Sequence, residues 1–148
     1  MSTDDTLTLD DFLCFAVYSA NHAFNRVYRP MLDRIGLTYP QYVVMVTLWG
    51  EDGMTVGQVG EKVLLETNTL TPLLKRLEAA GLVRRVRDTG DERQVRIFLT
   101  DQGQELRRAA LEIPGEIGSC LERDMSEITA LASQLIAVRD TLLARLKP

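Results

Sequence analysis

Residues 67–100 read TNTLTPLLKRLEAAGLVRRVRDTGDERQVRIFLT. Four leucines recur there at the spacing of one helix face, namely Leu70, Leu73, Leu74 and Leu77. Gly81 follows at the place where such a helix ends, and residues 82–87 and 94–99 then alternate like two strands. Thr89-Gly90-Asp91 supplies the turn between them. The stretch therefore predicts a short amphipathic helix followed by a two-stranded hairpin.

The same stretch is basic inside an acidic chain. Between Lys75 and Arg96, seven Lys and Arg residues stand against four Asp and Glu residues, a net of +3, whereas the whole 148-residue chain has a formal net charge of −4. Local positive charge on one helix and one hairpin indicates a surface that binds phosphate. A solvated charged face is the alternative, although ordinary surfaces mix both signs of charge.

A shorter helix is predicted just before this stretch. Thr55 and Gln58 fit a capping box, and three valines behind Thr55 are spaced to face inward: Val56, Val59 and Val63. A tight connection through residues 64–66 then leads into the leucine-rich helix. Two short helices with a brief turn between them, followed by a hairpin, are the layout of a winged helix-turn-helix.

Further helices are expected between the N-terminus and residue 50. The apolar spacing predicts a long amphipathic helix from Leu9 to Tyr28. Pro30 should restart the chain as the first residue of a short helix that ends near Gly36. Residues 39–49 are nearly all apolar and predict a buried core helix, which residues 50–53 close.

The C-terminal third predicts two more helices. Thr100 should cap a helix that runs to about Cys120 and is bent or interrupted at Pro114. The last helix, from about Met125, carries an apolar seam at alternating three- and four-residue steps: Ile128, Leu131, Leu135, Val138, Leu142 and Leu146. A seam of this kind needs a partner, so we expect it to form a homodimer interface together with the N-terminal helix.

These elements predict a mainly α fold with a small β-wing, in a single domain of residues 1–148. Residues 37–100 would form the winged DNA-binding part, and residues 9–36 and 101–148 the dimerisation helices. A symmetric pair of recognition helices reads two half-sites about one DNA turn apart, roughly 34 to 36 Å. The expected target is therefore double-stranded DNA with a near-palindromic operator.

The expected DNA contacts lie on the leucine-rich helix and on the hairpin. Burying the leucines turns the small polar residues and cations of the helix toward solvent, and the hairpin adds arginines suited to a minor groove or to phosphates. The expected contacts are Thr67, Asn68, Thr69, Thr71, Pro72, Lys75, Arg76, Arg84, Arg85, Arg87, Asp91, Arg93 and Arg96. Pro72 would remove a helical hydrogen bond if the helix starts at residues 66–67, and would be harmless if it starts nearer Asn68.

Composition argues against several classes of function. No window of about 18 apolar residues occurs and the N-terminus is polar and acidic, so we expect no membrane span, no signal peptide and a cytoplasmic location. A single histidine, His22, and no Cys-x-x-Cys motif argue against a metal site, and no cofactor is expected. Cys14 and Cys120 lie far apart in the sequence, and the expected compartment keeps thiols reduced, so we do not expect a permanent structural disulfide. One of the two cysteines could still be redox-active.

Three motifs carry a resemblance to a known family. They are Asp91-Glu92-Arg93-Gln94-Val95, the Leu99-Thr100 junction, and Leu77-Glu78-Ala79-Ala80-Gly81-Leu82-Val83. With them, residues 9–146 resemble the multiple-antibiotic-resistance regulator (MarR) family of dimeric winged-helix repressors. The resemblance implies that Asp91 and Arg93 brace the wing and present it to DNA.

Four other segments are similar to the organic-hydroperoxide-resistance regulators (OhrR group) of that family. They are residues 13–21, 28–30, 37–42 and 69–75. This resemblance implies that Cys14 senses peroxide, that Tyr28 and Tyr39 hydrogen-bond its thiolate across the dimer, and that an organic hydroperoxide is the inducer. Cys120 lies where two-cysteine members of the group carry a resolving cysteine.

The residues around Cys14 suit such chemistry. Near the start of its helix, the thiolate would be favoured by the positive end of the helix dipole and by phenol donors. Apolar and aromatic side chains expected to form a peroxide pocket are Phe12, Phe15, Tyr18 and Met45. The bland alternative is that Cys14 is a small buried hydrophobe, and Cys120 is either a resolving or a structural residue.

The expected function is a repressor, not an enzyme, that releases DNA when its thiol is oxidised. One alternative keeps DNA binding but replaces oxidation with a small phenolic or aromatic ligand, as in other members of the family. A second alternative is a thiol peroxidase, although the sequence lacks a redox-partner motif.

Overall fold

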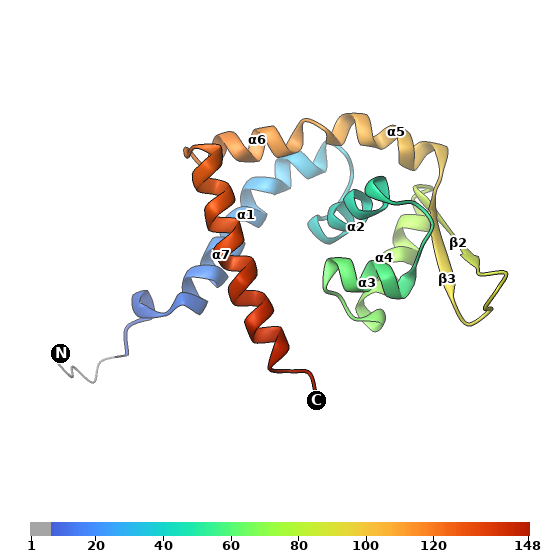
Figure 1. The fold of residues 1–148 in the computed structure, drawn as a ribbon. Helices are drawn as coiled ribbons and strands as arrows, with labels where there is room; N and C mark the ends of the chain where they lie inside the picture. Colours follow the sequence, from blue (N-terminus) through green and yellow to red (C-terminus); the bar gives the residue numbers. More distant parts are fainter. Residues whose placement is uncertain (1–6) are drawn as a thin grey trace. The chain divides into compact units, whose positions relative to one another are not determined.

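The computed structural model describes residues 7–148 (Figure 1). These residues form two compact units, one that ends at Leu111 and one that runs from Glu112 to Pro148. The elements of the first unit are a 3₁₀ helix η1 (Leu9–Asp11), α1 (Leu13–Asp33), α2 (Tyr39–Gly50), β1 (Met54–Thr55), α3 (Val56–Val63), α4 (Thr67–Ala79), β2 (Val83–Arg87), β3 (Val95–Leu99) and α5 (Asp101–Ala110). The second unit contains α6 (Ile113–Cys120) and α7 (Met125–Ala144).

The helix-turn-helix is formed by α3 and α4. The capping box is confirmed at Thr55: its Oγ1 accepts the Gln58 N–H at 3.1 Å, and Gln58 Oε1 accepts the Thr55 N–H at 2.9 Å. Leu64 ends α3 in the left-handed conformation, with φ 59°. The four leucines of α4 are buried, as the sequence predicts.

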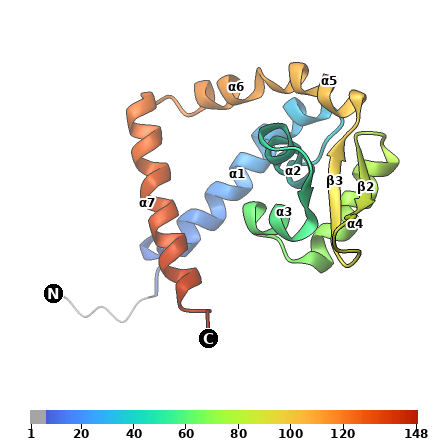
Figure 2. The same ribbon diagram turned by 45° about the vertical axis from the view of Figure 1, so that its right-hand side comes forward.

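A three-stranded antiparallel sheet with the order β1-β3-β2 carries the wing. The β2–β3 hairpin pairs Val83 with Leu99 and Arg87 with Val95, so the predicted strands are confirmed to within one residue at each end. Figure 1 shows this hairpin to the right of the α2–α4 helices, and Figure 2 shows the same strands from a second side. Strand β1 was not predicted, because two residues are too few to show an alternating pattern.

The core of the first unit lies between α2, the helix-turn-helix and the sheet. Its fully enclosed side chains include Val44, Met45, Leu48, Val59, Leu70, Leu74, Leu77 and Ile97. The prediction of a buried helix over residues 39–49 is confirmed by the burial of α2. A second capping box, between Thr38 and Gln41, starts that helix.

The N-terminal helices differ from the prediction. Helix α1 begins at Leu13, after η1, rather than at Leu9, and it continues through Pro30 to Asp33 without restarting. Proline has a φ that suits a helix and removes only one hydrogen bond, so packing of neighbouring turns can keep the helix continuous. Leu32, which is 3% exposed, supplies such packing just beyond Pro30.

The helix predicted from Thr100 was expected to be either bent or interrupted, and it is interrupted. Thr100 caps α5, because its Oγ1 accepts the Gly103 N–H at 3.0 Å. The break falls at residues 111–112, and Pro114 becomes the second residue of α6, where a missing N–H costs little.

Helix α7 starts at Met125, as predicted, and leaves its apolar seam uncovered. Leu131 is 53% exposed and Leu142 is 59% exposed. Ile136, which lies outside the seam, is also exposed, so apolar residues occur on more than one face of α7. None of the described helices is both long and apolar enough to cross a membrane.

Candidate nucleic-acid interface and redox site

Helix α4 presents a polar face opposite its buried leucines. The exposed residues on it are Thr67, Asn68, Thr69, Pro72, Lys75 and Arg76, and Thr71 is half-buried. The helix starts at Thr67, so Pro72 is its sixth residue and lies beyond the first turn. Pro72 has no N–H to donate to the carbonyl of Asn68, which is the cost that the sequence predicts for this start.

A shallow groove joins this face to the wing. It has a volume of about 350 Å³ and is lined by Thr55, Val56, Gly57, Thr67, Thr71, Arg93, Gln94 and Val95. The structure thus brings the wing residue Arg93 beside the start of α4 and the start of α3. A duplex that occupies this surface would meet the helix and the wing together.

The tip of the wing is shaped by Asp91. Its Oδ1 accepts the backbone N–H of Arg93 at 3.1 Å, and its carbonyl accepts the Gln94 N–H at 3.0 Å. Such a local turn fixes the backbone from which the Arg93 side chain leaves. Within the described residues no hydrogen bond or ion pair holds the Arg93 guanidinium, and Arg93 is exposed.

The other four wing arginines have partners inside the chain. Arg85 pairs with Glu78, and Arg96 pairs with Asp88 and with the carbonyl of Gly53. Arg87 Nη1 donates to the carbonyl of Glu92 at 3.2 Å. The Arg84 guanidinium lies 5.3 Å from the centre of the Phe98 ring, within cation–π range.

The Glu78–Arg85 pair also affects protonation. The backbone N–H of Arg85 and then its side chain donate to the Glu78 carboxylate, and together they hold the pKa of Glu78 below its usual value. The carboxylate therefore stays ionised at neutral pH, and the pair keeps its full charge.

Cys14 is the second residue of α1 and carries an exposed, free thiol. Unpaired N–H groups at this end of a helix favour an anion. Phe12 precedes the helix, Phe15 is half-buried, and the Tyr18 ring lies 6.5 Å from that of Phe15. Met45, the fourth residue expected at a peroxide pocket, is enclosed in the core with no exposed surface.

Three tyrosines cluster where α1 meets α2. The Tyr28 ring lies 5.1 Å from that of Tyr39 and 6.1 Å from that of Tyr42, centre to centre. Burial, and then the neighbouring Tyr39 and Tyr42, raise the pKa of Tyr28 to about 12. Tyr28 is therefore a neutral phenol, able to donate a hydrogen bond, throughout the physiological range. Sequence reasoning did not place Tyr42 in this group.

The chain does not bring Cys14 to Tyr28. They are fourteen residues apart on one continuous helix, which at about 1.5 Å per residue is a separation of roughly 21 Å along the axis. Any contact between this thiol and Tyr28 has to come from a second chain. Cys120, the other free thiol, is the exposed last residue of α6.

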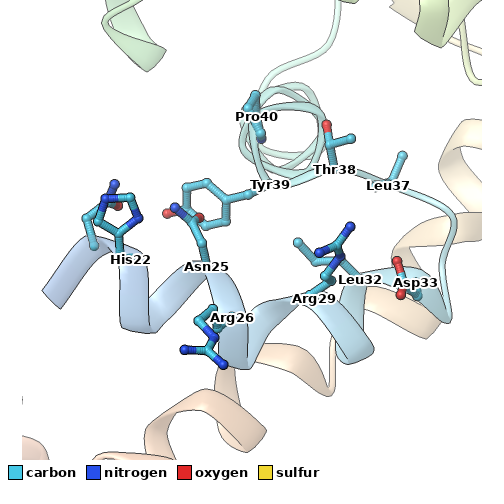
Figure 3. A pocket seen from close by; sticks show the side chains of 11 residues that line it. His22, Asn25, Arg26, Arg29, Leu32, Asp33, Leu37, Thr38, Tyr39 and Pro40 are labelled. Carbon is cyan, nitrogen blue, oxygen red and sulfur yellow. The ribbon is translucent and has the colours of Figure 1, made fainter. Parts of the chain in front are cut away.

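A pocket of about 720 Å³ lies between α1 and the start of α2 (Figure 3). Figure 3 shows Arg29 and Asp33 of α1 across from Thr38 and Tyr39. His22 and Asn25 also line it. This pocket was not predicted, although the polar residues spaced three and four apart along α1 are a sequence signal for it.

Comparisons with known proteins agree on one family. The model of the transcriptional regulator SarA/Rot family matches residues 26–109. The transcriptional regulator TtmR of Methylorubrum extorquens is 51% identical, over 96% of this chain and 73% of its own length. The organic hydroperoxide resistance transcriptional regulator of Bacillus subtilis is 38% identical, over 93% of this chain and 94% of its own.

This chain belongs to the MarR-type winged-helix transcriptional regulators. Among solved structures, this MarR-type chain is similar to reduced AbfR bound to DNA, with a TM-score of 0.80 and 38% identity over 91% of this chain and 92% of that one. AbfR is a Staphylococcus epidermidis protein, and its disulfide form matches with a TM-score of 0.63 and 39% identity over 92% and 90% of the two chains.

Proposed function

We propose that this MarR-type chain is a homodimeric, cytoplasmic repressor that is not an enzyme. It holds a near-palindromic operator while Cys14 is reduced and releases it when an organic hydroperoxide oxidises Cys14. The observation that carries the proposal is the exposed Cys14 thiol at the N-terminal end of α1, in a chain whose recognition helix and wing flank one groove. The Bacillus relative named for organic hydroperoxide resistance and the reduced, DNA-bound AbfR support it.

The proposed oxidation has two steps. The Cys14 thiolate attacks the O–O bond of ROOH and becomes a sulfenic acid, and the leaving alkoxide takes a proton to give ROH. The Cys120 thiol of the partner subunit then attacks the sulfenic sulfur, which forms a disulfide and releases water. The existence of a disulfide form of AbfR supports the second step.

Tyr28 and Tyr39 of the partner subunit are proposed to donate hydrogen bonds to the Cys14 thiolate. The high pKa of Tyr28 supports this role, because the phenol remains a neutral donor. Phe12, Phe15 and Tyr18 surround Cys14 in sequence and would favour a bulky peroxide. Met45 would contribute only from within the core, since no part of it is exposed.

Dimerisation is proposed to use the seam of α7 and exposed apolar residues of α1. Leu135 and Val138 are each 40% exposed in the single chain, as are Phe24 and Val27. Large apolar side chains left open along two long helices mark surfaces that another chain covers. The two recognition helices would then read the two half-sites of the operator.

Peroxide release of DNA tests the proposal. The probe is a fluorescent duplex selected from a randomised library by the reduced wild-type protein. We expect cumene hydroperoxide to release this duplex from the wild type but not from Cys14→Ser, because serine cannot form a sulfenic acid. The matched control is Ser19→Ala, on the same helix. Equal release of the duplex from wild type and from Cys14→Ser would contradict the thiol mechanism.

A phenolic or aromatic ligand is the second candidate for the inducer. It is favoured by the 720 Å³ pocket, whose Arg29 and His22 could bind a carboxylate or phenolate. Release of the duplex by salicylate in the absence of peroxide, abolished in Arg29→Ala but retained in Cys14→Ser, would support this candidate. Sustained turnover of peroxide with a thiol reductant would instead support a thiol peroxidase.

A further inference from the structure

We infer that Arg85 and Arg96 are positioning residues that fix the wing and do not themselves contact DNA, in contrast to Arg93, which the family resemblance already assigns to the DNA surface. The inference rests on the proposed DNA binding and departs from the expectation that all five wing arginines contact DNA. It follows from where each guanidinium is held. Two of them are tied to elements other than the hairpin.

Arg85 joins β2 to the recognition helix. Its backbone N–H donates to Glu78 Oε2 at 2.8 Å, and its Nε and Nη2 each lie 3.1 Å from Glu78 Oε1. Because the strand order is β1-β3-β2, β2 is an edge strand, and this N–H has no strand partner on its outer side. One carboxylate of α4 therefore satisfies both the edge backbone and the side chain of Arg85.

Arg96 joins β3 to the turn that follows α2. Its Nη1 donates to the carbonyl of Gly53 at 2.8 Å, and its Nε donates to Asp88 Oδ1 at 3.2 Å. Asp88 immediately follows β2, so the same guanidinium also links the two strands near the tip of the hairpin. The Asp88 side chain is 21% exposed, which leaves this link partly shielded from solvent.

These two arginines hold the wing from both sides. Glu78–Arg85 ties its outer strand to α4, and Arg96 ties its inner strand to the α2–β1 turn. A guanidinium that turned to a phosphate would break several hydrogen bonds and leave a carboxylate unpaired near a polyanion. Arg93 has no such bonds to lose within the described residues, and it lines the groove beside Thr67.

Salt dependence separates a cation that contacts phosphate from one that positions the wing. The affinity falls with salt, and each lost phosphate contact makes the negative slope of log K against log salt shallower by about 0.9. A dimer that loses one contact per chain therefore has a slope that is smaller in magnitude by roughly 1.8. We expect this decrease for Arg93→Gln on the selected duplex. Arg85→Gln and Arg96→Gln should weaken binding but leave the slope at its wild-type value.

A double-mutant cycle with Glu78 separates the two roles of Arg85, because they predict opposite effects of Glu78→Gln on DNA affinity. If Arg85 positions the wing, Glu78→Gln weakens binding as well, and the loss caused by Arg85→Gln shrinks in the Glu78→Gln background by at least about twofold, the lower range for residues in contact. If Arg85 contacts phosphate, Glu78→Gln tightens binding or leaves it unchanged, and the full loss persists. Asp88→Asn with Arg96→Gln is the parallel cycle for the second tie.

A measurement on the free protein keeps the test independent of DNA. Amide hydrogen exchange at Arg85 should be faster in Glu78→Ala than in wild type, because alanine has no side-chain oxygen to accept this N–H. Unchanged exchange, or a reduced salt slope in Arg85→Gln, would overturn the inference for Arg85, and a reduced slope in Arg96→Gln would overturn it for Arg96. Failure of the proposed function looks different: the wild type itself would select no duplex.

Discussion

At the scale of single residues, Tyr28 shows how neighbours set a chemical property. It is half-buried and packs against two further phenols, Tyr39 and Tyr42. Burial and the nearness of these phenols disfavour its anion, which raises the pKa of Tyr28 to about 12. The same environment that makes Tyr28 a dependable donor also penalises its ionisation in the folded chain.

This penalty predicts a loss of stability at high pH. The unfolded pKa is about 10 and the folded pKa about 12, so the contribution of Tyr28 is fully present below pH 10 and is lost as the pH rises to 12. The free energy of unfolding should therefore fall less steeply over this range in Tyr28→Phe than in wild type. Urea denaturation at several pH values measures this slope.

The exposed Tyr18 provides the matched control. Tyr18→Phe also removes one phenol hydroxyl, but from a ring that is 62% exposed and lies outside the tyrosine cluster. Identical slopes for wild type and Tyr28→Phe would show that Tyr28 ionises freely in the folded protein.

At the scale of elements, the junction between β3 and α5 depends on a close approach at Gly103. A Cβ at this position would collide with the carbonyl oxygen of Leu82. The Gly103 carbonyl accepts the Trp49 Nε1–H at 2.9 Å, and its N–H donates to Thr100 Oγ1. Thr100 in turn donates to the carbonyl of Gly81 at 2.6 Å.

We expect Gly103→Ala to destabilise the protein by about 1–3 kcal/mol, the usual cost of forcing extra volume into a packed site. Urea denaturation measures the change. Gly57→Ala is the control, because a Cβ there meets only Thr55 Oγ1, at 3.9 Å, and alanine should be neutral or favourable in a helix. If both variants lost equal stability, the contact with Leu82 would not be the cause.

Sequence patterns predicted elements whose signals are local. The leucine spacing of α4 and the Thr55–Gln58 cap sit within a few residues of the structure they specify, and both are confirmed. The predicted restart at Pro30 was wrong, because α1 continues through it. Whether a proline breaks a helix depends on the packing around it, which the local sequence does not show.

The candidate site divides in the same way. Cys14 and the basic wing could be predicted from the sequence, since each belongs to a short motif. The pairing of Arg85 with Glu78 is not, because the two residues are seven apart on different elements and meet only in three dimensions. Counting charges therefore overstates how many arginines are free to meet DNA.

At the scale of the whole molecule, the two thiols belong to different compact units. Treatment of the wild type with cumene hydroperoxide should give a covalent dimer on non-reducing electrophoresis that a thiol reductant reverses. Cys120→Ser should abolish this band, because the sulfenic acid of Cys14 then lacks its resolving thiol. Cys14→Ser should also prevent it. A band of undiminished intensity in Cys120→Ser would make Cys120 a structural residue.

The ties around Gly103 have a mechanical consequence. Helix α5 is fastened to the base of the wing through Thr100 and to α2 through Trp49, so a substitution that shifts its first turn would disturb the wing and α2 together.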